Sequence, residues 1–129
     1  MRVAVITPLH ETRLDWLRQC HASVRAQTHV CTHILVSDGG ANPLQDFQGQ
    51  HIRLSRSHAD YGDTPRAVGS VSAIGQQFDA LTYLDADDWY EPPHLETLVA
   101  LHRSTGAAVC TMSRKLYTPE GERLWPCIE

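Results

Sequence analysis

The sequence predicts an α/β protein with a mostly parallel sheet, flanked by helices, and a hairpin near its C-terminus. Short apolar strands alternate with amphipathic helices several times along the chain, which is the pattern of a parallel sheet covered on both faces. No internal repeat or low-complexity tract interrupts this alternation. Three of the expected strands end in a polar cluster, and ligands of such sheets bind beyond the carboxyl ends of the strands.

The first strand and helix are expected at the N-terminus. Residues 2–7 form an apolar run that ends at Pro8. Because proline cannot donate to a ladder of hydrogen bonds, we expect the strand to stop there. Apolar residues then recur at spacings of three and four over residues 14–24, which predicts a helix. Thr12 and Asp15 resemble a capping box with Asp in place of Glu.

The middle of the chain predicts two more strands and a second helix. Residues 33–37 are apolar and precede a loop signal rich in Gly, Asn and Pro over residues 38–43. Residues 51–55 alternate in the manner of an edge strand. Residues 65–78 then read as a helix, with proline at its first position and Thr64 as its cap.

The last third predicts a strand, a helix, a further strand and a hairpin. Residues 80–84 form the strand, and a helix follows the two prolines at 92–93 and ends at Gly106. Residues 107–112 are expected to form another strand. Residues 117–124 read as a hairpin with a Pro-Glu-Gly turn.

Composition sets limits on the protein class. A chain of 129 residues is one domain with room for a core and little room for a second lobe. Its 42% hydrophobic and 20% charged residues are typical of a globular protein, and its net charge of -4 argues against nucleic acid as a partner. We expect a cytoplasmic protein, with the inner face of the membrane as an alternative location, because no apolar run approaches a membrane span of about 20 residues. The spacing of the cysteines favours reduced thiols: Cys20, Cys31, Cys110 and Cys127.

The most informative cluster follows the strand at residues 80–84. Asp85, Asp87 and Asp88 place three carboxylates within four residues. A strand end can aim such hard oxygen ligands at one divalent cation, which in turn can carry a diphosphate. The alternative is a turn, in which aspartates serve local hydrogen bonds. The neighbouring Trp89 either stacks on a bound ligand or packs beneath the loop.

Several motifs occur in the order found in one large family. With its Rossmann-like sheet, the chain resembles the N-terminal, nucleotide-sugar-binding half of an inverting GT-A glycosyltransferase of the family 2 type, over residues 3 to about 124. The motifs are Val5-Ile6-Thr7-Pro8, Ser23 to Thr28, Leu35 to Gly40, Arg66-x-x-Gly69 and Tyr83 to Asp88, followed by Pro92 and Leu95-Glu96. The absence of a G-x-G-x-x-G after the first strand argues against a dinucleotide dehydrogenase. Thr7-Pro8 stands where a receiver domain needs an acidic pair, which argues against that class.

The resemblance implies a nucleotide-diphosphate sugar of the UDP type as donor and Mn²⁺ or Mg²⁺ as cofactor. Its acceptor would be a glycan or lipid-linked hydroxyl in cell-surface polysaccharide or lipopolysaccharide synthesis. The implied nucleotide-binding residues are Thr7, Pro8, His10, Glu11, Asp38, Arg66, Asp85 and Ala86. The implied metal ligands are Asp85, Asp87 and Asp88.

Some of these positions have other interpretations. Asp38 is expected to accept a hydrogen bond from a uracil-type imide, or alternatively to form an Asx-turn before Gly39. Arg66 and the start of its helix form an anion site, or Arg66 is a solvated residue or pairs with Asp63. His10 and Glu11 stand where the family often has Tyr-Asn, and Ala67 where asparagine is commoner. These departures weaken the implied base contacts.

The general base of an inverting transferase is not identifiable. In similar enzymes it lies in a later, acceptor-binding half, and the later carboxylates here are Glu120, Glu122 and Glu129. We expect residues 1–129 to form a single nucleotide-sugar-binding domain that lacks the acceptor half, either as a fragment or as a short relative. Trp125 and Ile128 would then favour a homo-oligomer. The alternative function is a non-catalytic nucleotide-binding or interaction module on the same scaffold.

Overall fold

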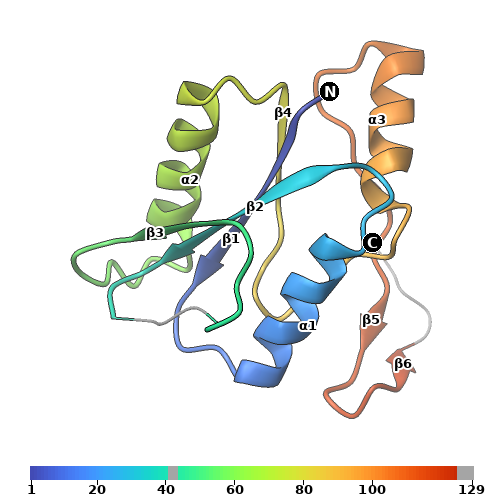
Figure 1. The fold of residues 1–129 in the computed structure, drawn as a ribbon. Helices are drawn as coiled ribbons and strands as arrows, with labels where there is room; N and C mark the ends of the chain where they lie inside the picture. Colours follow the sequence, from blue (N-terminus) through green and yellow to red (C-terminus); the bar gives the residue numbers. More distant parts are fainter. Residues whose placement is uncertain (41–43, 125–129) are drawn as a thin grey trace. The chain divides into compact units, whose positions relative to one another are not determined.

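The computed structural model describes residues 1–40 and 44–124, which fall into two compact units, Met1–Glu96 and Thr97–Glu129. The first unit contains a four-stranded parallel sheet. Its strands are β1 (Val3–Leu9), β2 (Cys31–Ser37), β3 (Gln50–Arg53) and β4 (Ala80–Tyr83), in the order β3-β2-β1-β4 (Figure 1). The expected parallel sheet is therefore confirmed, and the strand expected at residues 51–55 is an edge strand.

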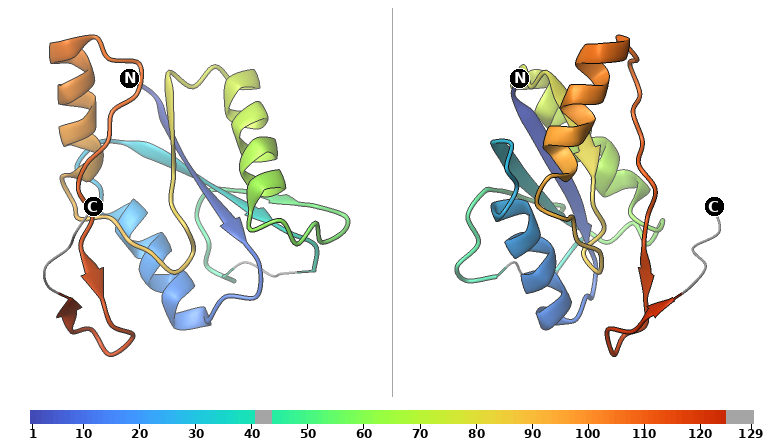
Figure 2. Two further views of the ribbon diagram at one scale, coloured as in Figure 1. Left: turned by 180° about the vertical axis from the view of Figure 1, so that it is seen from behind. Right: turned by 90° about the vertical axis from the view of Figure 1, so that its right-hand side faces the viewer.

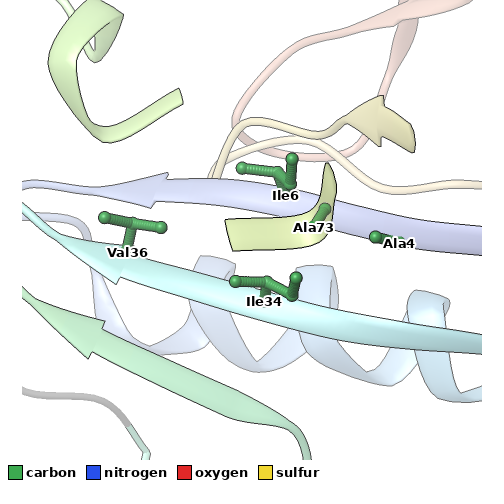
Figure 3. Packing of buried hydrophobic residues seen from close by; sticks show 5 residues of the cluster. All are labelled: Ala4, Ile6, Ile34, Val36 and Ala73. Carbon is green, nitrogen blue, oxygen red and sulfur yellow. The ribbon is translucent and has the colours of Figure 1, made fainter. Parts of the chain in front are cut away.

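The two faces of the sheet are covered by different helices (Figures 1 and 2). Side chains alternate along a strand, so residues two apart share a face. On one face, Ala73 of α2 (Asp63–Gly75) packs into a fully buried cluster. Its other members come from β1 and β2 (Figure 3): Ala4, Ile6, Ile34 and Val36. On the opposite face, Leu17 of α1 (Leu14–Arg25) packs with Leu9 and Leu35.

The strand order reverses beside β1. From β1 the chain crosses to β2 and then to the edge strand β3, and α2 carries it back to β4 on the other side of β1. Such a reversal leaves a crevice at the carboxyl ends of the two strands where the order changes, which is the usual ligand position in open α/β sheets. Here those strands are β1 and β4.

β1 does not stop at Pro8, contrary to the sequence-based expectation. Pro8 pairs with Val36 in the ladder to β2. Ile6 accepts a hydrogen bond from Leu84 on the β4 side, and Leu9 accepts one from Asp38 on the β2 side. Alternate residues thus point to opposite neighbours. Pro8, in phase with Ile6, has its missing N–H on the β4 side, and β4 pairs with β1 only as far as Ile6.

Both helix caps differ from the expected ones. The Thr12 hydroxyl donates to the carbonyl of His10, and the carboxylate of Asp15 instead accepts from the Arg13 guanidinium at 2.6 and 3.1 Å. The capping box is therefore absent from the start of α1. The α2 helix begins at Asp63. Thr64 does not act as its cap, because its own N–H donates to the carboxylate of Asp60.

α2 ends at Gly75, three residues before the expected end. The chain leaves the helix with Gln77 in a left-handed conformation at φ 61°, and Phe78 packs against the α2 face of the sheet from outside the helix. Among the apolar residues of α2, Val68 packs on the core, whereas Val71 and Ile74 are exposed.

The remaining elements confirm a helix and a hairpin. α3 (His94–Thr105) ends at Gly106, whose N–H donates to His102 and whose φ is 70°. β5 (Leu116–Tyr117) and β6 (Arg123–Leu124) pair antiparallel around a turn at Gly121. The strand expected at residues 107–112 is wrong: this segment is irregular and mostly exposed, and no strand among the described residues pairs with it. No helix in residues 1–40 and 44–124 has the length and apolarity needed to cross a membrane.

Candidate functional site

The polar clusters predicted at three strand ends belong to adjacent strands. The N–H of Asp38, just after β2, donates to Leu9 O at 2.8 Å. On the other side of β1, the N–H of Leu84, just after β4, donates to Ile6 O at 3.0 Å. The ends of β2 and β4 therefore flank the end of β1, and the clusters that follow them lie at one edge of the sheet.

The three aspartates after β4 converge. Asp88 N–H donates to Asp85 O at 3.0 Å and closes a turn. The side chain of Ala86 within this turn is buried in the cluster that contains Leu9 and Leu17. One carboxylate oxygen from each of Asp85, Asp87 and Asp88 lies within 4.8 Å of the others. Asp87 and Asp88 are exposed and Asp85 is half-buried. Three hard oxygen donors that converge in this way fit a divalent cation of the Mg²⁺ or Mn²⁺ type.

Arg66 pairs with one aspartate of this cluster. Its Nη2 donates to Asp85 Oδ1 at 2.5 Å, and its Nη1 donates to the carbonyl of Tyr61 at 2.9 Å. Asp63, the partner considered from the sequence, lies further away at 3.7 Å from Nη1. The guanidinium thus joins the first turn of α2 to the turn after β4. Spacing along the chain gave no signal for this pair, since its members are 19 residues apart.

The start of α2 offers few free backbone donors, contrary to the anion site expected there. Thr64 donates both its N–H and its hydroxyl to the carboxylate of Asp60, and this hydroxyl bond, above all, holds the pKa of Asp60 below its usual range. Pro65 has no N–H, and Arg66 N–H already donates to Gly62 O. The anion-binding capacity of this helix end therefore rests on the Arg66 side chain.

Asp38 is buried and holds the loop that precedes α2. Its Oδ1 accepts from the N–H and Nδ1 of His58 at 2.9 and 3.1 Å, and its Oδ2 accepts from Ala59 N–H at 3.1 Å and Ser57 Oγ at 3.3 Å. Burial acts to raise the pKa of Asp38, and these bonds outweigh it, so the net shift is downward. A carboxylate has about four acceptor positions. All four are in use, so contact with a base stays a prediction that requires one donor to leave.

The loop that Asp38 holds has an unusual backbone. Ala59 and Tyr61 adopt left-handed conformations with φ of 49° and 57°, and the Tyr61 side chain is 97% exposed. Gly62 follows with φ 85°, and a Cβ added to it would lie 3.1 Å from the ring of Pro8. Pro8, at the end of β1, is thereby in contact with this loop. A left-handed backbone conformation is unfavourable for residues other than glycine, and such residues often occur near binding sites.

The Thr7 side chain lies on the α1 face of the sheet. It is fully buried, and its hydroxyl contacts His33 Nε2 at 2.8 Å and Cys20 Sγ at 3.9 Å on the α1 side of the sheet. Burial raises the pKa of Cys20 to about 12. The hydroxyl of Thr7 is thus used inside the protein. His10 and Glu11, the next predicted residues, are exposed beyond the end of β1, and Glu11 has φ 34°.

The Thr7 contact belongs to a buried chain of neutral histidines. The Gln48 N–H donates to His21 Nε2, so His21 carries its proton on Nδ1 and donates to His33 Nδ1 at 3.0 Å. His33 then donates from Nε2 to Thr7. Burial, with a smaller contribution from His21, lowers the pKa of His33 to about 3. This network was not predicted from the sequence. It links Thr7 of β1 through His33 to His21 of α1.

The structure leaves the later carboxylates unassigned. Glu120 and Glu122 are exposed at the turn of the hairpin in the second unit. Glu129, Trp125 and Ile128 lie outside the described residues. Trp89 is 38% exposed, which leaves both stacking and packing open. Ser57, His58 and Asp60 were also not predicted as part of the site. The residues between 55 and 63 indicate a loop, but they do not indicate which distant residues the loop contacts.

Comparisons with known proteins agree with this architecture. The family model of Glycosyl transferase family 2 matches residues 4–129. The Bacillus subtilis (strain 168) protein named "Putative glycosyltransferase EpsH" is 24% identical over 101 residues, which cover 75% of this chain and 29% of that protein. Two solved structures of S. aureus TarS, one of them of residues 1-349, match with a TM-score of 0.64 at 14% identity. These matches cover 89% of this chain and 40% and 24% of the TarS chains.

The chain thus spans less than half the length of the relatives it matches. At 14% identity the TarS likeness concerns the fold, which is the GT-A arrangement of a parallel sheet between helices. The family model covers almost all of the chain, including the strand ends that carry Asp38 and the three aspartates. This chain belongs to glycosyl transferase family 2.

Proposed function

We propose that this chain is the donor-binding part of a metal-dependent glycosyltransferase. Its donor is a nucleotide-diphosphate sugar of the UDP type, and the sugar passes with inversion to an acceptor hydroxyl of a glycan or lipid-linked molecule in cell-surface polysaccharide synthesis. The observation that carries the proposal is the convergence of Asp85, Asp87 and Asp88 at the carboxyl end of β4, beside the point where the strand order reverses.

The charges at this edge support a diphosphate ligand. Asp87 and Asp88 are exposed and have the oxygen chemistry to hold Mn²⁺ or Mg²⁺. A bound divalent cation supplies neutralisation of the negative charge that develops on a departing nucleoside diphosphate. Arg66, held at the same edge by Asp85, contributes a second positive charge that can pair with phosphate oxygens in a bidentate manner.

The protein's own residues then position the donor. Pro8 contacts Gly62 and so joins β1 to the loop of residues 57–62. Arg66 links this loop to the aspartates, because its side chain donates to Tyr61 O and to Asp85. Asp38 fixes the other end of this loop. Catalysis by this part of the enzyme is positional and electrostatic. No general base is assigned among the described residues.

Calorimetric titration with UDP tests the proposal. We expect wild-type protein to bind UDP in the presence of Mn²⁺ and to lose most of that affinity when the metal is removed by a chelator. Asp87→Ala should abolish metal-dependent binding, because one of three converging oxygen ligands is gone. Asp15→Ala removes an exposed aspartate from the start of α1 and serves as the matched control. Tight UDP binding that needs no metal and is unaffected by Asp87→Ala would refute the proposal.

A further inference from the structure

We propose that Arg66 acts as a removable counter-ion for the aspartate cluster, so that a divalent cation and a nucleoside diphosphate bind cooperatively. The guanidinium pairs with Asp85, and a cation arriving alone must compete with it. A diphosphate offers Arg66 another anionic partner and thereby releases Asp85. This inference rests on the proposed function and specifies how ligand binding at that site is coupled.

The geometry places Arg66 in direct competition for one of the three aspartates. Its Nη2 lies 2.5 Å from Asp85 Oδ1, a short charge-assisted hydrogen bond. Both side chains are partly shielded, with 27% of Arg66 and 47% of Asp85 exposed. A carboxylate oxygen that accepts a guanidinium proton at this distance is a poorer ligand for a cation, because the two positive charges repel each other.

The charge balance explains why a counter-ion is needed. Like charges a few ångströms apart destabilise one another, and the carboxylate oxygens of Asp85, Asp87 and Asp88 converge within 4.8 Å. Arg66 offsets one of the three negative charges. The pair with Arg66 therefore reduces the repulsion among the three carboxylates and lowers their affinity for a metal ion that binds without a diphosphate.

Arg66 is also positioned to receive a diphosphate. It lies in the first turn of α2, whose other donors are taken: Thr64 N–H by Asp60 and Arg66 N–H by Gly62. A phosphate arriving at this helix end would thus find the guanidinium as its main donor. Because binding free energies are linked reciprocally, a diphosphate that draws Arg66 away from Asp85 raises the affinity for the cation, and the cation raises the affinity for the diphosphate.

Titration with Mn²⁺ alone, followed by the electron paramagnetic resonance signal of the free ion, tests this inference. Arg66→Gln should bind Mn²⁺ about three- to tenfold more tightly than wild type, because the competitor is removed. The same variant should bind UDP more weakly at saturating Mn²⁺, because the diphosphate has lost its guanidinium partner. This opposite response distinguishes a counter-ion from a simple ligand contact.

Arg13→Gln is the matched control. It removes one positive charge and one arginine–aspartate pair, that of Arg13 with Asp15, at a place outside the aspartate cluster. Its Mn²⁺ affinity should stay within about twofold of wild type, in line with the small effect of exposed ion pairs. Arg66→Lys keeps the charge without the planar fork and should give an intermediate Mn²⁺ affinity, which also covers the case of an unstable Arg66→Gln.

The possible results separate the two proposals. If wild type binds no UDP with Mn²⁺, the proposed function fails. If wild type binds both, but Arg66→Gln takes up Mn²⁺ no more tightly than wild type, or neither protein takes up Mn²⁺ alone, the counter-ion role is refuted and the donor site stands. An equal gain in Arg13→Gln would show that general charge, and not Arg66, governs the affinity.

Discussion

Asp38 Oδ1 accepts two hydrogen bonds from His58, one from its backbone N–H at 2.9 Å and one from its ring Nδ1 at 3.1 Å. The aspartate follows β2 and the histidine lies 20 residues later, in the loop before α2. Since a carboxylate is only an acceptor, the histidine carries its proton on Nδ1. This pair ties the loop of residues 57–62 to the edge of the sheet.

Asp38→Asn should destabilise the protein by about 1–3 kcal/mol, the usual cost of leaving buried donors unsatisfied. The amide keeps the size of the side chain and presents one N–H₂ group to donors that need an acceptor. Urea unfolding checks the value, with Asp15→Asn as a surface control that should leave stability unchanged. Unchanged stability of Asp38→Asn together with lost UDP binding would instead assign the carboxylate to the nucleobase.

The buried histidine pair should make the fold sensitive to acid. The pKa of His33 is lowered to about 3 in the folded protein, against about 6.5 in an unfolded chain. Between these values the unfolded state binds more protons, so stability is full above pH 6.5 and falls as the pH drops. His33 alone should cost about 2 kcal/mol at pH 5 relative to pH 7.5. Urea unfolding at both values measures this difference.

His33→Gln is the control for this acid sensitivity. The variant cannot titrate in this range, so its own loss of stability between pH 7.5 and pH 5 should be smaller than that of wild type by about the same amount. The variant is expected to be less stable at both pH values, since it disrupts the bonds to His21 and Thr7. An identical pH dependence in the two proteins would contradict the neutral state of His33.

Gly69→Ala should destabilise the protein although alanine favours helices. The helical preference is worth about 1 kcal/mol. However, a Cβ at Gly69 would lie 2.6 Å from Ile6 Cγ2 and 3.2 Å from Val36 Cγ2, and overpacking of a buried core costs about 1–3 kcal/mol. We expect the second effect to exceed the first, giving a net loss that thermal unfolding can measure.

Gly75→Ala provides the comparison within the same helix. A Cβ there meets no atom within 4 Å, so alanine should be neutral or stabilising. A stabilised Gly69→Ala would show that α2 approaches the sheet less closely than described. A destabilised Gly75→Ala would show that the end of the helix has less free space than described.

Most of the fold was predictable because hydrophobic periodicity reports local structure. The strands at β1, β2 and β4, both crossover helices and the hairpin around Gly121 were expected from apolar spacing and turn residues. The predictions were wrong where the local structure depends on pairing with a neighbouring strand. The continuation of β1 through Pro8 depends on which side β4 pairs. Residues 107–112 have a strand-like composition, and composition alone supplies no partner strand.

The site was predictable in its position more than in its contacts. Strand ends in a parallel sheet meet at one edge, so the grouping of Asp38 with the aspartates after β4 followed from the order of elements. The bonds from Asp38 to residues 57–59 and from Arg66 to Asp85 did not. They join residues about 20 positions apart through a loop whose path depends on left-handed residues such as Ala59 and Tyr61.

The capping of Thr64 by Asp60 has a consequence for how the spent nucleotide would depart. Because the amides at the beginning of α2 are already satisfied, this helix end offers the leaving group no main-chain donors. Retention of the nucleotide would then depend on the divalent cation, which a chelator removes, and on the Arg66 side chain, whose ion pairs salt weakens. We expect a brief wash with EDTA in moderate salt to strip nucleotide from the purified protein.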